Sequence, residues 1–301
     1  DNLLMKKILI TGGTGFIGNH LIKECLKKGW KTYSLSSKKV DKKDKIKRVK
    51  YFFIDVRNKN KLINLKKYKF DYVVNLSGEV NHKIKVKVIR THFLGVKNLL
   101  SNLNLSNLKL FIQIGSSAEY GKCSKLQKET LRCYPKSYYG KAKLSATNYL
   151  LNNKKYKNFS KCVLRFYQVY GPNQKDNRII PYVIKNCLLD KKFNCSTGTQ
   201  IRDFIYITDV TSAIFKCFSH PKKVNNQIIN IGYGKGYKLI NVIKKILNNT
   251  GKGKPLFGAI KMRKDETKKV IPNIFKAKKI LKWKPMISLN QGLKLTINSF
   301  K

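Results

Sequence analysis

The sequence predicts an α/β protein built on a doubly wound parallel sheet with helices on both faces, joined by a smaller, discontinuous C-terminal domain. Short apolar segments of the kind that form buried strands recur along the first 171 residues, separated by helical or loop segments. The first of these segments continues into a cluster of glycines and then into a helical pattern. A strand, a glycine turn and a helix in this order are typical of the beginning of such a sheet.

The glycine cluster belongs to the stretch Thr11-Gly12-Gly13-Thr14-Gly15-Phe16-Ile17-Gly18, which contains the pattern G-x-G-x-x-G. Such glycines let the backbone turn sharply and approach a pyrophosphate, and the next helix offers its N-terminal N–H groups to the phosphates. The stretch therefore predicts a Rossmann-type dinucleotide-binding site made by Gly12, Gly15, Phe16, Ile17 and Gly18. The alternative is a glycine turn that binds no ligand. An NTPase phosphate loop is excluded, because Asn19 stands where that loop needs lysine.

The remaining elements follow in order along the chain. The first helix is expected to end at Gly29, a residue suited to a C-terminal cap. Further strands are expected at Lys31–Ser36, Val49–Val56, Asp71–Ser77, Lys109–Ser117 and Lys161–Gly171. Beyond residue 171 prolines punctuate a less regular half. We therefore expect a dinucleotide-binding domain of residues 1–171 plus 201–232, and a substrate domain of residues 172–200 plus 233–301.

The composition is strongly basic, with a formal net charge of +50 that would attract nucleic acid or anionic membranes nonspecifically. The basic residues are mostly lysine and are spread along the whole chain, which favours surface drift over specific nucleic-acid binding. No apolar run approaches the ~18 residues that a membrane span needs, so no membrane partner is predicted. The seven scattered cysteines form no C-x-x-C pair, so we expect free thiols in a reducing cytoplasm and no metal site.

A candidate catalytic pair follows the stretch Ile114–Gly121, which ends a predicted strand, where ligands lie in open α/β sheets. Tyr139 and Lys143 are four residues apart, so on a helix they share one face. A lysine ammonium near a phenol favours the phenolate and lowers the pKa of the tyrosine from ~10. Such a tyrosine can exchange a proton with a carbonyl or hydroxyl during hydride transfer, and a nearby serine would polarise the carbonyl. Tyr138 cannot form the same pair, because Ala142 lies four residues after it.

Further motifs accompany these residues along nearly the whole chain, at Gly115–Gly121, Val163–Pro172, Arg202–Val210, Asn230–Gly232 and Leu281–Pro285. Together with the glycine stretch and the tyrosine–lysine pair, they resemble the motifs of the extended short-chain dehydrogenase/reductase family, also called the NAD-dependent epimerase/dehydratases. Because they occur in the family's order, their combination is far more specific than any single motif. The resemblance implies a nicotinamide cofactor and a nucleotide-diphosphate sugar bound in the cleft between the two domains.

The resemblance also implies the catalytic roles. Tyr139 is expected to be the acid/base, and Lys143 its partner, which also bonds the nicotinamide ribose. Ser117 is expected to place its hydroxyl on the reacting sugar carbon, with Ser116 as the less favoured substitute. His92 stands where the family often has asparagine, and we expect it to be an ordinary core or surface histidine.

The substrate contacts follow from the same resemblance. Arg202 matches an arginine on the substrate diphosphate, and Arg263 and Glu266 resemble a pair that holds the nucleotide. The predicted substrate-binding residues are Ser117, Gln168, Arg178, Arg202, Arg263 and Glu266, with Gln168 in place of the usual asparagine. Asp203 and Asp209 are expected to be structural, holding a loop and capping the next helix.

The cofactor preference is predicted from the end of the second strand, where an NAD-preferring site usually presents a carboxylate. Ser36 stands there, and a hydroxyl with Lys38 and other lysines would suit a 2′-phosphate, so NADP(H) is favoured and NAD(H) stays possible. Asp55 could accept from the adenine amine, or could be a satisfied loop aspartate. The predicted cofactor-binding residues are Gly12, Gly15, Phe16, Ile17, Gly18, Ser36, Lys38, Asp55, Val56, Leu76, Ser77, Tyr139 and Lys143.

The predicted activity is the reduction of a nucleotide-diphospho-4-keto-6-deoxyhexose at C4. An NADP(H) preference favours a reductase, because epimerases of the family keep NAD bound and recycle it. Ala118 replaces the aspartate of the family's 4,6-dehydratases, which argues against dehydration. NAD-dependent 4-epimerisation is the alternative, and a non-catalytic basic binding protein is a remote one. The resemblance further implies a homodimer formed through two helices.

Overall fold

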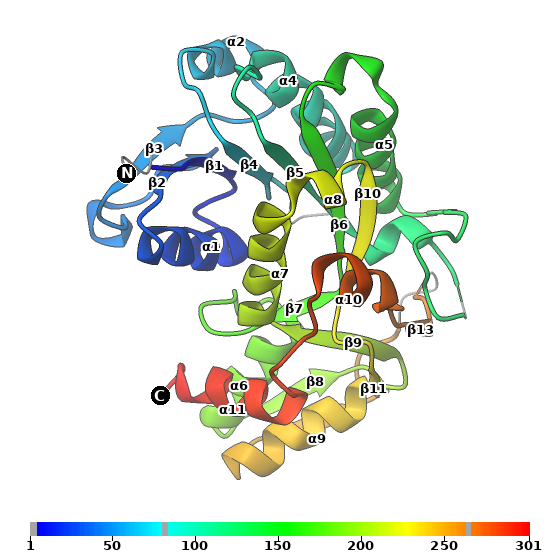
Figure 1. Ribbon diagram of the computed structural model, residues 1–301. Coiled ribbons are helices and arrows are strands. Elements are labelled where there is room, and N and C mark those ends of the chain that lie inside the picture. The colour runs from blue at the N-terminus through cyan, green and yellow to red at the C-terminus, as the bar shows by residue number, and fades with distance from the viewer. Residues whose placement is uncertain (1–4, 80–83, 124, 263–265) are drawn as a thin grey trace.

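Seven parallel strands form the main sheet, in the order β10-β6-β5-β4-β1-β2-β3 (Figure 1). They are β1 (Lys7–Thr11), β2 (Lys31–Ser36), β3 (Val49–Phe53), β4 (Tyr72–Asn75), β5 (Leu110–Ser116), β6 (Ser160–Phe166) and β10 (Gln227–Ile231). The computed structural model describes residues 5–79, 84–123, 125–262 and 266–301. The strand order reverses between β1 and β4, which confirms the predicted doubly wound sheet and places its ligand-binding crevice there.

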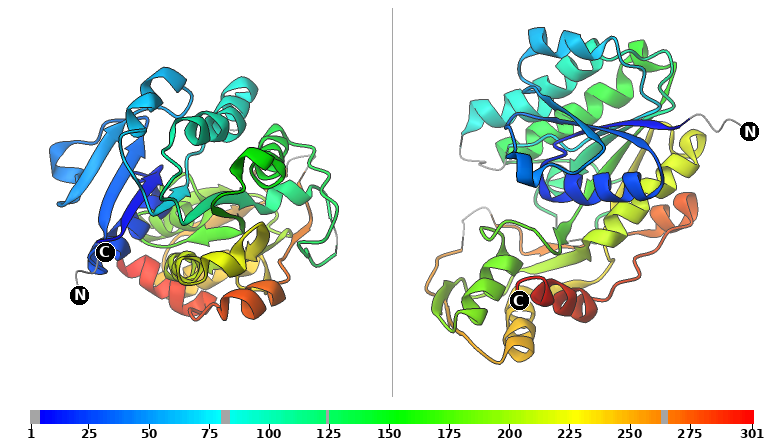
Figure 2. Two further views of the ribbon diagram at one scale, coloured as in Figure 1. Left: turned by 45° about the horizontal axis from the view of Figure 1, so that its top comes forward. Right: turned by 90° about the vertical axis from the view of Figure 1, so that its left-hand side faces the viewer.

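Helices cover both faces of this sheet (Figure 2). One face carries α1 (Phe16–Lys27), α7 (Ile207–Ser219), α8 (Pro221–Val224) and α10 (Phe275–Leu281). The other carries α2 (Lys59–Leu62), α4 (Gly95–Asn102) and α5 (Tyr138–Asn152). Helix α3 (Lys85–Ile89) packs beside α5 and continues into α4 through a π-helical turn, η3 (Arg90–Leu94).

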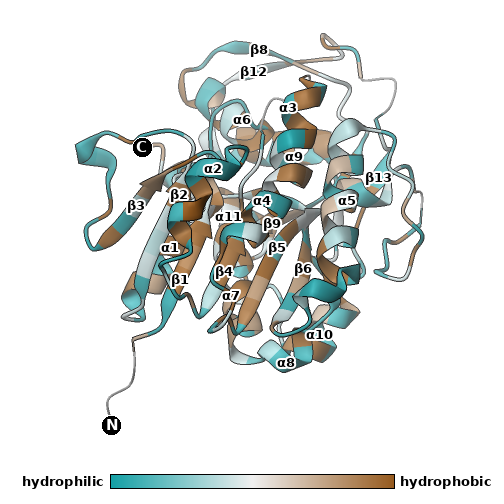
Figure 3. Cartoon of the chain, turned by 90° about the horizontal axis from the view of Figure 1, so that it is seen from above, coloured by the Kyte–Doolittle hydropathy of each residue, from teal (hydrophilic) through white to brown (hydrophobic). Residues whose placement is uncertain are grey.

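The two helical layers bury alternate residues of the same strands. Ile8 and Ile10 of β1 pack in one apolar cluster with α1 and α7, whereas Leu9 packs in the other cluster with α4 and α5. Successive side chains of a strand point to opposite faces, so a strand covered on both sides must be apolar throughout. Apolar colouring accordingly runs along the central strands of the main sheet (Figure 3).

A second sheet lies below the main one in Figure 1. Its strand β9 (Ile201–Tyr206) pairs with β7 (Gln168–Tyr170), β11 (Gly236–Lys238) and β13 (Lys269–Val270). A separate pair joins β8 (Lys192–Cys195) to β12 (Lys254–Phe257). The helices α6 (Ile179–Leu188), α9 (Leu239–Thr250) and α11 (Leu289–Asn298) share a third apolar cluster with this part of the chain.

The structure changes two expectations about strands. The strand expected at 161–171 is two strands, because β6 pairs in the main sheet and β7 pairs with β9. Within the range 201–232, β9 belongs to the second sheet, whereas α7 and β10 return to the main one. The division of the chain into two domains stays a prediction. Among the described residues, no helix has both the length and the apolar character needed to cross a membrane.

Candidate active site

The glycine turn and the loop after β4 lie side by side at the point where the strand order reverses. Gly12 has a φ of +67°, and a Cβ there would lie 2.8 Å from the carbonyl oxygen of Leu76. A Cβ at Gly18 would clash with the backbone of Gly12, so α1 packs directly on the turn. Gly15 is the N-cap of α1 and brings no side chain over its N-terminus. This cradle fits the phosphates of a dinucleotide, with Leu76 and Ser77 on its other side.

The end of β2 faces this turn. Ser36 is buried, and its hydroxyl accepts from the backbone N–H of Thr14 at 3.3 Å and bonds the Thr14 hydroxyl at 3.0 Å. Lys38 is exposed two residues further on. The position that a carboxylate would take in an NAD-preferring site is therefore a hydroxyl tied into the glycine turn, with an exposed cationic side chain nearby.

Asp55 follows β3, and its carboxylate is hydrogen-bonded to a neighbouring side chain. Its carboxylate receives hydrogen bonds from Nε and Nη2 of Arg57, at 2.9 Å and 2.5 Å. These hydrogen bonds lower the pKa of Asp55. Because a carboxylate has further acceptor sites, contact of Asp55 with the adenine amine stays a prediction. Val56 is buried, and a Cβ at Gly95 of α4 would lie 2.8 Å from its side chain.

Tyr139 and Lys143 lie on α5, as predicted. The side chain of Ser137 caps this helix by accepting from the N–H of Gly140 at 3.0 Å, which fixes where the helix begins. The ammonium of Lys143 lies 5.9 Å from the centroid of the Tyr139 ring and donates to the carbonyl oxygen of Ile114 at 2.7 Å. The pair therefore stands against the carboxyl end of β5.

The protonation of the pair differs from the sequence argument. We expected Lys143 to lower the pKa of Tyr139, but burial of the phenol raises it, while a hydrogen bond with Ser116 and the charge of Arg178 act in the opposite direction. Burial also lowers the pKa of Lys143 to about 8, and the charge of Glu119 opposes this effect. Desolvation disfavours the charged form of each group, and a sequence does not show how deeply a group is buried.

The hydroxyl that meets Tyr139 belongs to Ser116. Its side chain hydrogen-bonds Tyr139, whereas Ser117 begins the short 3-10 helix η4 (Ser117–Tyr120). Ser116 is the N-cap of that helix, accepting from the N–H of Ala118 at 3.1 Å, and Glu119 completes the capping box. The preference for Ser117 over Ser116 as the hydroxyl on the reacting sugar carbon stays a prediction. The spacing Ser-x-x-Glu is the sequence signal that could have identified Ser116 as the cap.

His92 is buried, which agrees with the core alternative of the expectation. It lies on η3, and its ring meets that of Tyr139 edge-to-face at 5.0 Å between centroids. The sequence analysis missed this neighbour of the catalytic tyrosine. The only sign of this contact in the sequence was that a histidine stands where the family often has asparagine.

The predicted substrate residues occupy the second sheet and its border with the first. Arg202 on β9 forms an ion pair with Glu266, and both side chains are more than four-fifths buried. Arg178 is the exposed N-cap of α6, and its charge acts on Tyr139. Gln168 is exposed on β7. Arg263 lies outside the described residues.

Asp203 holds a loop as expected, whereas the expectation that Asp209 caps the next helix is wrong, because Tyr206 is the N-cap of α7 and no side chain among the described residues caps that helix. Asp203 accepts from the backbone N–H groups of residues 233–235 at 2.6–2.9 Å, and so holds that loop. Burial raises the pKa of Asp203 to about 7, against these hydrogen bonds. Asp209 accepts from the N–H groups of Met286 and Ile287, which ties α7 to the segment before α11.

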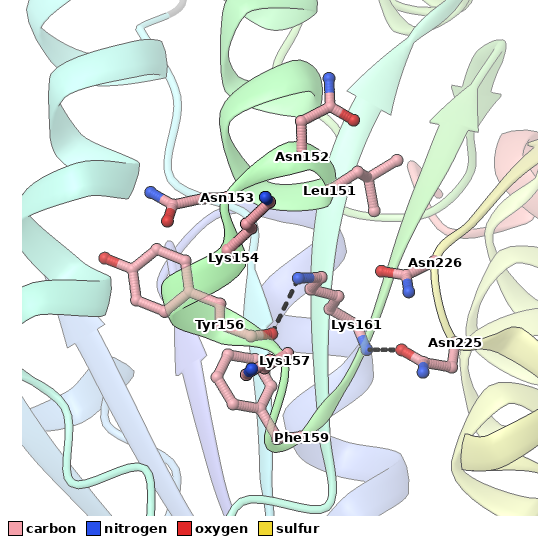
Figure 4. A pocket seen from close by; sticks show the side chains of 10 residues that line it. All are labelled: Leu151, Asn152, Asn153, Lys154, Tyr156, Lys157, Phe159, Lys161, Asn225 and Asn226. Atoms are coloured by element: carbon pink, nitrogen blue, oxygen red, sulfur yellow. Dashed lines mark hydrogen bonds between the residues drawn. The ribbon is translucent and has the colours of Figure 1, made fainter.

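Two surface cavities lie outside the surroundings of Tyr139. One, of about 180 Å³, is formed by the end of α5 and the segment before β6 (Figure 4). There the buried ammonium of Lys161 donates to the carbonyl oxygen of Tyr156 at 2.8 Å. The other, of about 320 Å³, is lined by residues of α4, η3 and the loop after β3. Tyr139, Lys143 and Ser116 line neither cavity. We therefore identify the candidate site from the contacts between its side chains and not from a cavity.

A dinucleotide cradle and a tyrosine–lysine pair on one parallel sheet are features of a nicotinamide-dependent enzyme. Comparison with known proteins agrees. The sequence profile of the NAD-dependent epimerase/dehydratase family matches residues 8–232. The chain therefore belongs to this family, as its motifs had indicated.

Individual relatives cover almost the entire chain. The chain is 26% identical over 301 residues to a CDP-abequose synthase of Salmonella muenchen, with 96% of each chain covered. The structure of a UDP-glucose 4-epimerase of Thermotoga maritima with UDP-glucose has a TM-score of 0.91 at 26% identity, covering 98% of both chains. A UDP-glucuronic acid 4-epimerase of Bacillus cereus with UDP-glucuronic acid and NAD has a TM-score of 0.87 at 27% identity, covering 97% of this chain and 98% of that one. The chain is an enzyme of the nucleotide-sugar epimerase/dehydratase type.

Proposed function

We propose that this enzyme reduces a nucleotide-diphospho-4-keto-6-deoxyhexose at C4, with Tyr139 as the proton donor. The observation that carries the proposal is the contact of Ser116 and Tyr139 at the carboxyl end of β5, beside the ammonium of Lys143. A reduced nicotinamide, when bound, supplies the hydride. The Ser116 hydroxyl polarises the ketone oxygen, and Tyr139 protonates that oxygen as the alcohol forms.

Burial raises the pKa of Tyr139, which favours the protonated phenol that ketone reduction consumes. Oxidation of a sugar alcohol, the first step of an epimerase, needs the phenolate instead. The likeness to a CDP-abequose synthase over 96% of each chain also supports a reductase.

The surroundings of the site give no support to dehydration. Glu119 is the carboxylate nearest to the Ser116 turn, but it is fully buried and paired with Arg165. A carboxylate held in this way cannot protonate a leaving hydroxyl without breaking a buried ion pair. Ala118 offers no second acid.

A second candidate is NAD-dependent 4-epimerisation. The observation that favours it is the TM-score of 0.91 to a UDP-glucose 4-epimerase at 26% identity. The related UDP-glucuronic acid 4-epimerase was solved with NAD. We propose NADP(H) for this chain, because Ser36 and Lys38 replace the carboxylate that would select NAD, and NAD(H) belongs to the epimerase alternative.

We propose that the substrate diphosphate lies against Arg202, with Arg178, Gln168 and Glu266 nearby. The guanidinium of Arg202 suits a diphosphate because it can donate two parallel hydrogen bonds. Its ion pair with Glu266 keeps it in place on β9. Arg263 stays part of the proposed set from the sequence.

We propose that a second copy of the chain is the protein partner. Val86, Ile89 and Leu94 are exposed apolar residues on α3 and η3, beside α5. An apolar helical face of this kind is suited to packing against the same face of another subunit. Sedimentation of the purified protein tests this, and a monomer at all concentrations contradicts it.

The function is tested in two measurements on the purified protein. Calorimetric titration with NADPH and NADH gives the cofactor preference, and Tyr139→Phe serves as a binding-competent, inactive control. A panel of nucleotide-linked 4-keto-6-deoxy sugars is then offered with the preferred reduced cofactor, and its oxidation is followed by absorbance. A clear preference for NADH, or NAD that co-purifies tightly, with conversion of a nucleotide hexose to its C4 epimer, would establish the epimerase instead.

A further inference from the structure

The carboxylate of Glu119 joins three elements around the candidate site. Its Oε1 accepts from the backbone N–H of Ser116 at 2.8 Å. Its Oε2 accepts from the hydroxyl of Thr147 on α5 at 3.0 Å and from Nε of Arg165 on β6 at 2.9 Å. The Glu119 side chain is 0% exposed, so these contacts replace water entirely.

Two of these contacts connect Glu119 to the elements that carry Ser116 and Tyr139. Ser116 hydrogen-bonds Tyr139 directly, and Thr147 follows Tyr139 and Lys143 at successive four-residue intervals on α5. Residues at this spacing share one face of a helix, so the same face carries both the catalytic pair and the group that bonds Glu119.

We propose that Glu119 is a positioning residue that locks the turn carrying Ser116 onto the helix carrying Tyr139 and Lys143. The proposal rests on the proposed function only in naming those three residues as catalytic. Glu119 itself acts through its hydrogen bonds to Ser116 and Thr147.

Two glycines make room for this arrangement. A Cβ at Gly115 would clash with Oε1 of Glu119, so only glycine lets the carboxylate fold back over β5. A Cβ at Gly140 would lie 2.5 Å from the carbonyl oxygen of Ala118, so glycine also lets α5 approach the turn closely. The turn therefore packs closely on both β5 and α5, and interiors packed this closely transmit small displacements.

Arg165 pairs with the carboxylate of Glu119 inside the protein, and a carboxylate has acceptor sites for all three hydrogen bonds. Its side chain is 2% exposed, and its guanidinium lies 4.5 Å from the centroid of the Tyr120 ring. Removing one partner of a buried ion pair leaves an uncompensated charge and destabilises the fold strongly. Arg165 is therefore unsuitable for a test of positioning, whereas Thr147 can lose its hydroxyl and keep its shape.

The charge of Glu119 also acts on the catalytic pair, since it raises the pKa of both Tyr139 and Lys143. Other elements contribute groups that face the phenol as well. The groups around Tyr139 are Lys143 on its own helix, Ser116 and Glu119 at η4, His92 on η3 and Arg178 before α6.

The first test compares Thr147→Val with Thr147→Ser. The valine variant is expected to lower kcat by about fivefold or more at unchanged NADPH affinity, because a hydrogen bond to a charged group is lost. The serine variant keeps the hydroxyl and is expected to stay within about twofold of the wild type. Thr296→Val is the matched control, since Thr296 is a buried helical threonine that bonds Gly292 on α11. Equal kcat in Thr147→Val and Thr296→Val, with both proteins destabilised alike, would overturn the proposal.

The second test needs no substrate. Thr147→Val removes one hydrogen bond of Glu119 and keeps its ion pair with Arg165, so the Tyr139 titration is expected to differ from that in Thr147→Ser, because the phenol no longer has the same surroundings. The titration is followed by carbon NMR of ζ-labelled tyrosine, with the signal assigned through Tyr139→Phe. The same Tyr139 titration in both variants would count against the proposal. If no sugar nucleotide is turned over, the proposed function fails, while this titration still decides the role of Glu119.

Discussion

The imidazole of His92 meets the ring of Tyr139 edge-to-face, with centroids 5.0 Å apart and planes at 83°. Its Nε2 lies 3.1 Å from the backbone N–H of Glu79, and a Cβ at Gly78 would lie 2.9 Å from its Cε1. The loop after β4 therefore holds the histidine ring against the phenol.

Replacing His92 by asparagine should lower kcat while leaving NADPH affinity within about twofold. An aromatic pair contributes about 0.5–1.5 kcal/mol beyond its buried area, which corresponds to a loss of up to about tenfold if it is realised in the transition state. His220→Asn is the control, because His220 bonds Lys216 at the end of α7, away from the site. Indistinguishable kcat values for the two variants would show that the contact has no catalytic role.

Tyr139→Phe should abolish turnover and leave cofactor binding nearly intact, since only the titrating hydroxyl is removed. Tyr138→Phe is the control on the same helix, because the Tyr138 side chain is exposed. Steady-state kinetics and calorimetry on both variants make the comparison. Substantial activity in Tyr139→Phe would mean that another group supplies the proton.

Ser116→Ala should lower kcat by about 10²-fold, because it removes a donor to the developing oxyanion. Ser117→Ala should have a much smaller effect, since Ser117 begins η4 and the hydroxyl bonded to Tyr139 is that of Ser116. Loss of the N-cap also weakens η4, so thermal unfolding is measured alongside the kinetics. The reverse order of effects would support the assignment to Ser117.

We predict that cofactor affinity and kcat depend on pH through Lys143. Because burial lowers its pKa to about 8, the ammonium is present below that pH and is lost as the pH rises through it. Affinity for NADPH and kcat should therefore fall above about pH 8 if the ammonium bonds the nicotinamide ribose. In Lys143→Arg the guanidinium stays charged, so the affinity should no longer fall there. An affinity that is flat from pH 7 to 9 in the wild type would exclude this role.

Arg202→Ala should weaken substrate binding far more than cofactor binding. Loss of a charged hydrogen-bond donor to a buried diphosphate corresponds to about 1.5–3 kcal/mol, or about tenfold to a hundredfold in Kd. Arg132→Ala is the control, because Arg132 is exposed and stacks on Tyr134. Equal losses for substrate and cofactor would assign Arg202 to the structure of β9, where it pairs with Glu266.

The sequence was sufficient wherever neighbours along the chain determine the structure. The glycine turn at Gly12–Gly18, the strand Lys31–Ser36 and the pair Tyr139 and Lys143 are local patterns, and the structure contains each of them as expected. The capping box from Ser116 to Glu119 is equally local, and its Ser-x-x-Glu spacing favours Ser116 over Ser117 as the cap. The hydrogen bonds from Arg57 to both oxygens of Asp55 could not be predicted from the sequence.

The sequence alone determined the family, the order of the elements and the placing of Tyr139 and Lys143 on one helix face, because hydrophobic period, turn residues and helical spacing act over a few residues. Only the tertiary structure decided which groups surround that tyrosine. Glu119 meets Arg165 across 46 positions of the chain, and His92 reaches Tyr139 from another helix. Burial then set the direction of the Tyr139 pKa against the effect expected from Lys143. Desolvation and long-range contacts arise from packing elements together, and no local pattern contains them.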